Sequence, residues 1–432
     1  MLLPLLLLAP GDELVAASFD PPALQVFDVP TGALERTLGF GSPLAGTLGA
    51  TIGPDGLLYV ASEATNEVLR FEPSSGAWID AFVTDDPNTT VDETGGLDGP
   101  SGVLFGPDGR LYVGSFNGDS VLAYDGRSGA FDAVFVQSAA GGLNGPDSGM
   151  AFGPDGSLYV PSYWNRRVKR YDGSTGAFID NFLTPATSGL RNPRAVFFPG
   201  DGTVLATSEG SDEVLRFDAA TGAFLDVFIG DDPATPGDES GGLDGPTGIV
   251  RTPDGTWWVA SVNTDDIKRY ASDGASLGTP IAAGSGGLAT PVHLVLRPRT
   301  TPGCAGSPNS AGAGAALVAR GSTSVSADDF ALELSFAPPQ QLVVAVQGTA
   351  GPPMPAGDGA ICLSGALFRR AVATTDARGH AMAAIDLASP QVPAAAIVAG
   401  STWSFQAAYR DPAGPGSTGF NFSASLGATF GP

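Results

Sequence analysis

Short apolar runs alternate with polar turns along roughly the first 300 residues of the chain. The runs are rich in β-branched and aromatic residues and are bounded by Gly, Pro, Asp or Ser, which is typical of β-strands. One stretch reads GVLFG, then the turn Pro107-Asp108-Gly109, then LYVGS, VLAYD and AFDAVFV. In such a turn Pro presets φ and Gly accepts a left-handed conformation. The pattern therefore predicts a unit of four short strands.

This four-strand unit repeats along the chain. Its turn aspartates are spaced by 53, 47, 46 and 53 residues. They are Asp55, Asp108, Asp155, Asp201 and Asp254. A first copy without this turn spans residues 14–38. A single four-stranded sheet cannot bury both of its faces, whereas sheets stacked around an axis cover one another, so the repeat predicts a β-propeller.

The number of strands predicts six blades. The second, third and fourth strands of the unit occur six times, but candidates for the innermost strand occur seven times, including residues 5–8 and residues 292–296. Because propellers commonly close their ring with a C-terminal strand, we assign residues 292–296 to the first blade. Residues 1–11 are then expected to be the remnant of a secretory signal, although the run lacks a basic start and also aligns with a strand of the repeat.

Two stretches carry a resemblance to a known family. They are FGPDGRLYVGSFNGDSVLAYD (105–125) and FGPDGSLYVPSYWNRRVKRYD (152–172). Both resemble the NHL repeats of secreted bacterial six-bladed propellers, which are related in fold to the SMP-30/gluconolactonase-like and virginiamycin B lyase-like propellers. The resemblance covers roughly residues 12–298. It implies the fold but not the function, because such propellers serve as binding platforms, lyases and lactonases.

The rest of the chain predicts a second domain. Residues 299–316 are rich in Gly, Ala, Ser and Pro and are expected to be a linker, and residues 317–432 contain alternating apolar runs typical of a β-sandwich. The two cysteines, Cys304 and Cys362, lack CxxC spacing, which favours a disulfide over a metal site. The segment also resembles a C-terminal module of secreted bacterial proteins that has no established activity. We therefore predict an all-β chain, a six-bladed β-propeller followed by a small β-sandwich, in an extracellular or periplasmic location.

The charge of the chain restricts its partners. The formal net charge is −24, with 45 acidic and 21 basic residues, and nearly all of the excess lies before Gly303. Such a surface repels phosphate backbones, so a nucleic acid is not expected as a partner. No apolar run is long enough to span a membrane. We expect a monomer whose ligand is a protein, a peptide or a glycan.

One loop differs in charge from its counterparts in the other blades. Loops between the second and third strands of a blade emerge on one face of a propeller, and most of them here are acidic or neutral. The exception is SYWNRRV (162–168). An aromatic ring beside guanidinium groups can stack a sugar or hold a carboxylate, whereas the simpler alternative is that the arginines pair with acidic neighbours. The candidate ligand-binding residues are Tyr163, Trp164, Asn165, Arg166 and Arg167.

Two connections between blades are nearly identical and acidic. They are DDPNTTVDETGGLDGP (85–100) and DDPATPGDESGGLDGP (231–246), which follow the second and the fifth blade. Carboxylates in a flexible loop can bind Ca²⁺, although acidic surface loops are often only solvated. The candidate metal ligands are Asp85, Asp86, Asp92, Glu93 and Asp98 in the first connection and Asp231, Asp232, Asp238, Glu239 and Asp244 in the second.

The sequence offers little for catalysis. His293 lies in the predicted ring-closing strand and is a weak candidate for a general base facing the channel. The other inner strands, such as GVLFG and GMAFG, are apolar or small. We therefore favour an extracellular, non-catalytic binding or scaffold protein, with a metal-dependent lyase or lactonase as the alternative. Several acids, Asn or His converging on the axis would favour the enzyme, and an apolar or plugged channel would favour the binding protein.

Overall fold

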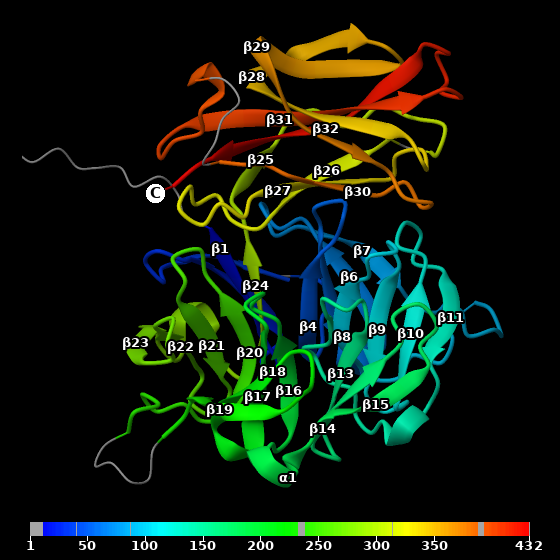
Figure 1. Ribbon diagram of the computed structural model, residues 1–432. Helices are drawn as coiled ribbons and strands as arrows, with labels where there is room; N and C mark the ends of the chain where they lie inside the picture. Colours follow the sequence, from blue (N-terminus) through cyan, green and yellow to red (C-terminus); the bar gives the residue numbers. More distant parts are fainter. Residues whose placement is uncertain are drawn as a thin grey trace, which may run out of the picture.

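The chain folds into two β-rich parts stacked on each other (Figure 1). The computed structural model describes residues 12–39, 41–86, 88–231, 238–312, 314–387 and 393–431. Within these ranges, six antiparallel sheets of four strands form the first part, and a five-stranded and a three-stranded sheet form the second. The predicted fold class, a six-bladed propeller followed by a β-sandwich, is confirmed. The predicted signal remnant at residues 1–11 lies outside the described residues.

The six blades follow one another along the chain, with the strands of each blade running from the axis outward. Blade 1 contains β24 (Pro291–Arg297), β1 (Glu13–Ser18), β2 (Ala23–Asp28) and β3 (Leu34–Leu38). Blade 2 contains β4 (Thr47–Ile52), β5 (Leu58–Ser62), β6 (Glu67–Phe71) and β7 (Trp78–Val83). Blade 3 contains β8 (Pro100–Phe105), β9 (Leu111–Ser115), β10 (Ser120–Tyr124) and β11 (Phe131–Val136).

The remaining three blades repeat this order. Blade 4 contains β12 (Ala151–Phe152), β13 (Leu158–Ser162), β14 (Arg167–Tyr171) and β15 (Phe178–Leu183). Blade 5 contains β16 (Pro193–Phe197), β17 (Thr203–Ser208), β18 (Glu213–Asp218) and β19 (Phe224–Ile229). Blade 6 contains β20 (Pro246–Arg251), β21 (Trp257–Ser261), β22 (Asp266–Tyr270) and β23 (Ser276–Ile281).

Single helical turns occur at η1 (Glu63–Thr65), η2 (Ala140–Gly142), α1 (Pro185–Ser188), η3 (Glu209–Ser211), η4 (Ser285–Gly287) and η5 (Pro393–Ala395). None of the described helices is long and apolar enough to cross a bilayer.

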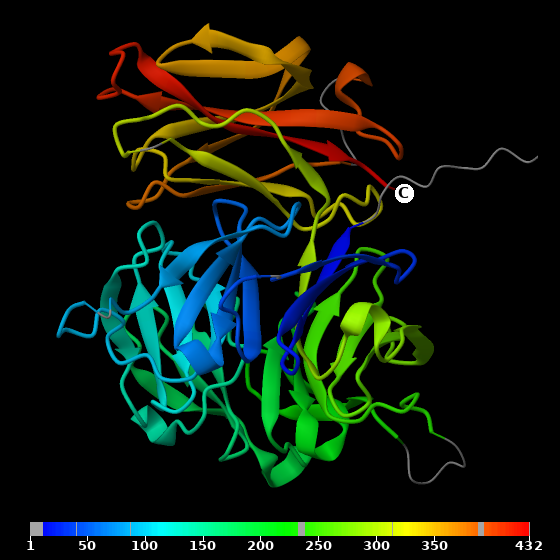
Figure 2. The ribbon, with the colours of Figure 1, turned by 180° about the vertical axis from the view of Figure 1, so that it is seen from behind.

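The ring closes through the first blade. β24 pairs antiparallel with β1 from Glu13 opposite Arg297 to Ser18 opposite Pro291. Both views show β1 in dark blue beside β24 in yellow-green (Figures 1 and 2). The C-terminal strand therefore completes the N-terminal blade, as the count of inner strands predicted.

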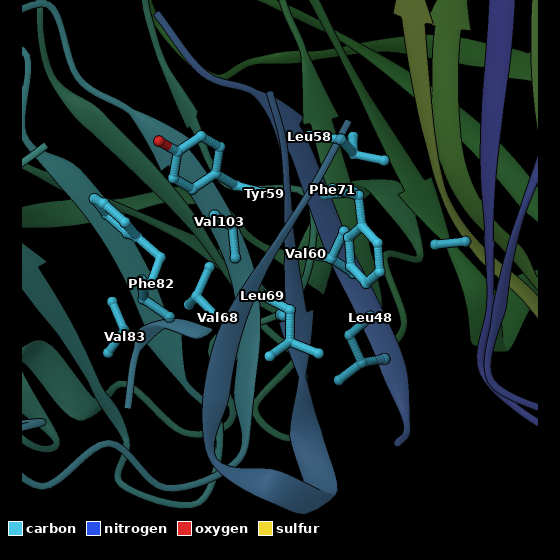
Figure 3. Packing of buried hydrophobic residues seen from close by; sticks show 14 of the residues in the cluster. Leu48, Leu58, Tyr59, Val60, Val68, Leu69, Phe71, Phe82, Val83 and Val103 are labelled. Carbon is cyan, nitrogen blue, oxygen red and sulfur yellow. The ribbon is translucent and has the colours of Figure 1, made fainter. Parts of the chain in front are cut away.

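In blades 2, 3 and 4 the repeated aspartate of the turn holds a tyrosine between two blades. Asp55 accepts a hydrogen bond from the backbone N–H of Leu57 at 3.1 Å and from the Tyr59 hydroxyl at 2.9 Å. The Tyr59 ring packs edge-on against Phe82 of its own blade, with centroids 5.0 Å apart (Figure 3). It also packs edge-on against Phe105 of the next blade, at 4.9 Å. Tyr112 and Tyr159 repeat this arrangement. The Asp and Tyr of the repeat thus serve packing between the blades.

The second part is a β-sandwich. Its larger sheet has the order β25 (Thr300–Pro302), β32 (Gly419–Thr429), β31 (Thr402–Asp411), β28 (Leu342–Ala356) and β29 (Gly359–Thr374). The smaller sheet contains β26 (Ala316–Arg320), β27 (Ala331–Ser335) and β30 (Ala381–Ala384). Buried side chains of both sheets, such as Leu332 and Phe405, share one core.

The segment expected to be a linker belongs in part to the sandwich. β25 lies within residues 299–316 and pairs with β32, so only two residues separate the end of β24 from the start of the larger sheet. Its backbone hydrogen bonds could not be read from its composition. The predicted disulfide between Cys304 and Cys362 is present, and it ties this entry segment to β29.

The sandwich covers the face of the propeller that carries the Pro-Asp-Gly turns (Figure 1). The hydroxyls of Ser322 and Thr323 donate hydrogen bonds to the buried carboxylate of Asp12 at 3.0 and 2.9 Å. Arg320 donates to the carbonyl of Ile52 at 3.1 Å. The opposite end of the propeller is left uncovered by the sandwich.

Candidate binding site on the loop face

The uncovered end of the propeller is formed by the loops between second and third strands and by the connections between blades. We call it the loop face. The two kinds of segment are joined by backbone hydrogen bonds, for example from Glu63 N–H to the carbonyl of Gly46 and from Tyr163 N–H to the carbonyl of Gly145. Because the sandwich occupies the other end, ligands can reach this face directly.

Three aromatic side chains lie together on the loop face. Phe116 comes from the loop of blade 3, and Tyr163 and Trp164 come from the loop of blade 4. The rings of Tyr163 and Trp164 meet edge-on at 4.9 Å, and Phe116 lies 6.2 Å from Tyr163 and 6.3 Å from Trp164. Trp164 is 60% exposed. We call these residues the aromatic group.

A partly buried arginine lies against this group. Arg194, at the start of β16, forms ion pairs with Asp147 at 3.2 Å and with Glu209. Its guanidinium group lies 4.8 Å from the centre of the Tyr163 ring, and the Tyr163 hydroxyl donates to Glu209 at 3.2 Å. The side chain of Arg194 is only 18% exposed and that of Asp147 only 1%.

The close contact of two inner strands brings these charges together. Gly149 donates a backbone hydrogen bond to the carbonyl of Arg194 at 2.9 Å and accepts one from Val196 at 3.0 Å. A β-carbon on Gly149 would lie 2.2 Å from that of Ala195, so only glycine allows this approach. Asp147, two residues before Gly149, is thereby held beside Arg194.

A further carboxylate, that of Glu63 in the loop of blade 2, faces the same charges. Burial raises the pKa of Glu63, the negative charge of Asp147 raises it further, and Arg194 opposes both effects. Burial also raises the pKa of Asp147, against the influence of Arg194. We call Glu63, Asp147, Tyr163, Arg194 and Glu209 the channel-mouth cluster, since Arg194 and Asp147 precede residues that line the central channel.

The structure brings together only some of the predicted ligand-binding residues. Tyr163 and Trp164 lie in the aromatic group, but the arginine against Tyr163 is Arg194 rather than Arg166 or Arg167. Arg166 is exposed at the left-handed position of its loop, with φ of 57°. None of the ion pairs among the described residues includes Arg166 or Arg167.

Two side chains of the predicted loop bind backbone carbonyls instead. Arg167 begins β14 and its side chain donates to the carbonyl of Asn165 at 3.0 Å, and the Asn165 amide donates to the carbonyl of Gly142.

The prediction from sequence missed Arg194, although the sequence shows an arginine there that the other blades lack. The equivalent inner-strand positions of blades 2, 3 and 6 hold the uncharged residues Leu48, Ser101 and Thr247.

The acidic connections are folded by hydrogen bonds among their own residues. Glu93 accepts from the backbone of Asp86 at 3.1 Å and from Thr89 at 2.6 Å, and its own N–H donates to Asp85 at 3.1 Å. The neighbouring Glu93 carboxylate raises the pKa of Asp85. Asp92 accepts from the N–H and hydroxyl of Thr94 at 2.9 and 2.5 Å.

The second acidic connection repeats these contacts in its described part. The backbone N–H of Glu239 donates to the Asp231 carboxylate at 3.2 Å, and the Glu239 carboxylate raises the pKa of Asp231. Asp238 accepts from Ser240 at 2.5 Å, whereas Asp232 lies outside the described residues. The last acids of the two connections, Asp98 and Asp244, accept hydrogen bonds from the amides of Asn117 and Asn263 at 3.1 and 2.7 Å.

Among the residues that the structure describes, no three His, Cys, Asp or Glu side chains are grouped to hold a metal. Calcium binding therefore stays a prediction.

The central channel has both apolar and polar lining residues and is covered at one end. Its cavity of about 770 Å³ is lined by the inner strands and, on the side of the sandwich, by residues such as Ser322 and Asp329. His293 lies in this wall, and burial lowers its pKa to about 4, so its imidazole is neutral at pH 7. Of the described residues that line the cavity, His293 is the only histidine and Asp329 the only acid.

These features define the class of protein: a six-bladed β-propeller with a β-sandwich on one face and an aromatic and charged surface on the other. No protein-family model and no curated relative matches the chain. A solved chain of the nidogen/laminin complex is similar to it, with a TM-score of 0.50 and 14% identity, covering 66% of this chain and 98% of that one.

Two other solved structures are similar at lower scores. One is a catalytically inactive virginiamycin B lyase from Staphylococcus aureus with quinupristin, at a TM-score of 0.44 and 16% identity, covering 64% of this chain and 86% of that one. The other is a protein of unknown function from Bacteroides caccae, at 0.47 and 9%, covering 66% and 98%. At these identities the likeness shows the fold alone.

Proposed function

We propose that this chain is an extracellular or periplasmic binding protein that holds a protein, peptide or glycan on its loop face. The observation that carries the proposal is Trp164, which is 60% exposed on the open face while its neighbour Tyr163 is held by the partly buried Arg194. Exposed Trp and Tyr side chains beside Arg are the residues that contribute most to binding energy at interfaces. Their rigid setting limits the entropy lost on binding.

The channel offers few groups for catalysis. Its described lining residues include one histidine and one acid, and the sandwich covers one end. A metal-dependent lyase or lactonase would need several convergent metal ligands or acid–base groups near the axis. The Cys304–Cys362 disulfide supports an oxidising compartment such as the cell exterior or the periplasm.

The experiment uses the full chain on a glycan array and against a displayed peptide library. Every ligand found is then measured against Trp164→Ala and against the control Trp78→Ala. Trp78 is also exposed, at 44%, but lies on the outer strand β7 away from the loop face. Truncating an aromatic hot spot costs about 2 kcal/mol, which is about 30-fold in Kd. We expect this loss for Trp164→Ala only.

Two results would overturn the proposal. The first is that every ligand binds Trp164→Ala and wild type equally well. The second is that the bound compound is chemically converted during the assay, which would favour the lyase or lactonase alternative.

A further inference from the structure

Blade 4 differs from the other blades at the turn that ends its loop on the loop face. In blades 2, 3, 5 and 6 this turn holds a residue with φ of 51–58° whose side-chain oxygen accepts a hydrogen bond at 2.6–2.8 Å. The donor is a backbone N–H of the connection to the next blade. These residues are Asn66, Asp119, Asp212 and Asp265. Blade 4 has Arg166 at this position, and a guanidinium group has no acceptor atom, so it cannot form this contact.

Two further positions of the same region hold arginine in blade 4. The third strand of this blade, β14, begins with Arg167, whereas the equivalent strands of blades 2, 3, 5 and 6 begin with an acid or a serine. Those four residues are Glu67, Ser120, Glu213 and Asp266. In the connection from blade 4 to blade 5, the carbonyl of Arg191 accepts from the backbone N–H of Gly210 at 3.2 Å. The equivalent carbonyls after blades 2, 3 and 5 belong to Asp98, Asn144 and Asp244.

Arg166 and Arg191 lie close together with their side chains free. The N–H of Arg166 and the amide of Asn192, which follows Arg191, both donate to the carbonyl of Tyr163 at 3.3 Å. Both arginines are exposed, and neither guanidinium group forms an ion pair or a hydrogen bond with any residue that the structure describes. Their charges are therefore available to a ligand.

Trp164 is a fourth departure from the repeat at this place. The equivalent residues of blades 3 and 6 are Asn117 and Asn263, whose amides hold the acids of the preceding connections. Trp164 keeps the backbone contact, to the carbonyl of Asn144 at 3.3 Å, but its ring is directed to solvent and is 60% exposed. We call Trp164, Arg166, Arg167 and Arg191 the blade 4 patch.

The acidic surroundings limit how much negative charge this patch can hold. Most of the formal net charge of −24 lies before Gly303, and the connections 85–100 and 231–246 of the loop face are acidic. The nearby carboxylates of Asp147 and Glu209 are paired with Arg194. Because like charges repel, an extended polyanion is disfavoured, whereas one negative group placed between the free arginines is attracted.

We propose that the blade 4 patch binds a sugar carrying a carboxylate, at the end of an otherwise neutral glycan. The inference rests on the proposed function and narrows it to one class of ligand. A guanidinium group binds a carboxylate through two parallel hydrogen bonds, which Arg166 and Arg191 are free to donate. The flat ring of Trp164 offers an apolar surface to the C–H groups of the sugar.

The test measures binding of carboxylated sugars to the full chain by isothermal titration calorimetry at physiological salt. The probes are methyl β-D-glucuronide and a methyl α-sialoside, each compared with its own methyl ester, which is neutral. Arg166→Asn should weaken binding of the acid about tenfold, since a charge-assisted hydrogen bond is lost. The matched control is Arg369→Asn, which removes the same charge from an exposed position of β29 in the sandwich. We expect the control to change Kd less than twofold.

The variant Arg166→Asn also separates a loss of binding from a loss of folding. Asn adopts the left-handed conformation more readily than Arg, and its oxygen can accept from the N–H of Asn192, as Asn66 accepts from Gly99 at 2.8 Å. We therefore expect Tm to rise by about 2 °C while binding falls. A lower Tm would show that Arg166 stabilises the loop and would contradict its role in binding.

The other outcomes separate this inference from the proposed function. If Arg166→Asn and Arg369→Asn change Kd equally, or if the methyl esters bind as well as the acids, the patch does not hold a carboxylate. Tighter binding of acetyl-triglutamate amide than of either sugar, dependent on Arg166, would assign the patch to a peptide instead. If neither acid binds while another ligand depends on Trp164, the inference fails and the proposed function stands. If no ligand depends on Trp164, both fail.

Discussion

Replacing Arg194 by Met tests whether the buried ion cluster organises the loop face. Met keeps an unbranched apolar stem of similar reach but removes the charge. Asp147 then lies 1% exposed without a cation, and Glu209 loses its partner as well. The guanidinium contact with Tyr163 at 4.8 Å is lost with it.

The cost follows from these contacts. Removing one partner of a buried ion pair destabilises a protein by about 3–5 kcal/mol, because a buried charge is left uncompensated. The cation–π contact adds about 0.5–2 kcal/mol. We therefore expect the free energy of unfolding to fall by about 4 kcal/mol. In Asp147→Asn/Arg194→Met most of this loss should be regained, since no buried carboxylate then remains beside the missing cation at that position.

The dependence on pH has a definite sign. The folded state raises the pKa of Asp147, so ionising this carboxyl disfavours folding. The penalty is absent below the unfolded pKa of about 3.9, grows as pH rises toward the folded pKa, and is complete above it. Removing Arg194 raises the folded pKa further. The stability deficit of Arg194→Met should thus be larger at about pH 8 than at about pH 5.

Urea unfolding followed by tryptophan fluorescence at both pH values measures these differences. This role of Arg194 is refuted if Arg194→Met loses less than about 1 kcal/mol, or if the double variant is as unstable as the sum of the single variants predicts. An equal deficit at both pH values would also contradict it.

Two further predictions concern the disulfide and the acidic connections. Replacing both Cys304 and Cys362 by Ser should lower the free energy of unfolding of the sandwich by about 4 kcal/mol, from the loop entropy of a 58-residue separation, and an unchanged urea midpoint would contradict this. If the connections bind calcium, Ca²⁺ at about ten times its Kd should raise Tm by about 3–5 °C, and Glu93→Gln should reduce the rise. Differential scanning calorimetry with and without a chelator measures it, and no response to Ca²⁺ would reject calcium binding.

The propeller could be predicted because its information is local and repeated. Five of the six units carry a turn aspartate, and a pair such as Asp55 and Tyr59 is only four residues apart. Counting inner strands also identified β24 as the strand that closes the ring. These features depend on residues that lie close together in the chain, so one sequence is enough to predict the propeller.

The charged cluster could not be predicted, because its members meet only after the ring has formed. Asp147 and Arg194 are 47 residues apart and belong to different blades. A sequence shows an arginine in an apolar strand but not which carboxylate faces it. The conspicuous arginines at 166 and 167 were chosen for their neighbours in the chain, whereas contacts across blades decide which guanidinium lies on Tyr163.

The position of the sandwich was beyond prediction for the same reason. Asp12 meets Ser322 across a separation of 310 residues, and both are ordinary polar residues in the sequence. The strand β25 consists of Thr, Thr and Pro, which show no apolar alternation, so its pairing with β32 left no pattern to read.

The direct passage from β24 into β25 makes the propeller and the sandwich one mechanical unit. Only Pro298 and Arg299 separate the strand that locks the ring from the strand that opens the sandwich sheet. A force that pulls the propeller and the sandwich apart would act through this two-residue connection. It would load the antiparallel β24–β1 pairing in shear along its whole length. Pulled in that geometry, the ladder's hydrogen bonds resist together rather than unzipping singly. The two parts would therefore stay joined until blade 1 itself unfolded.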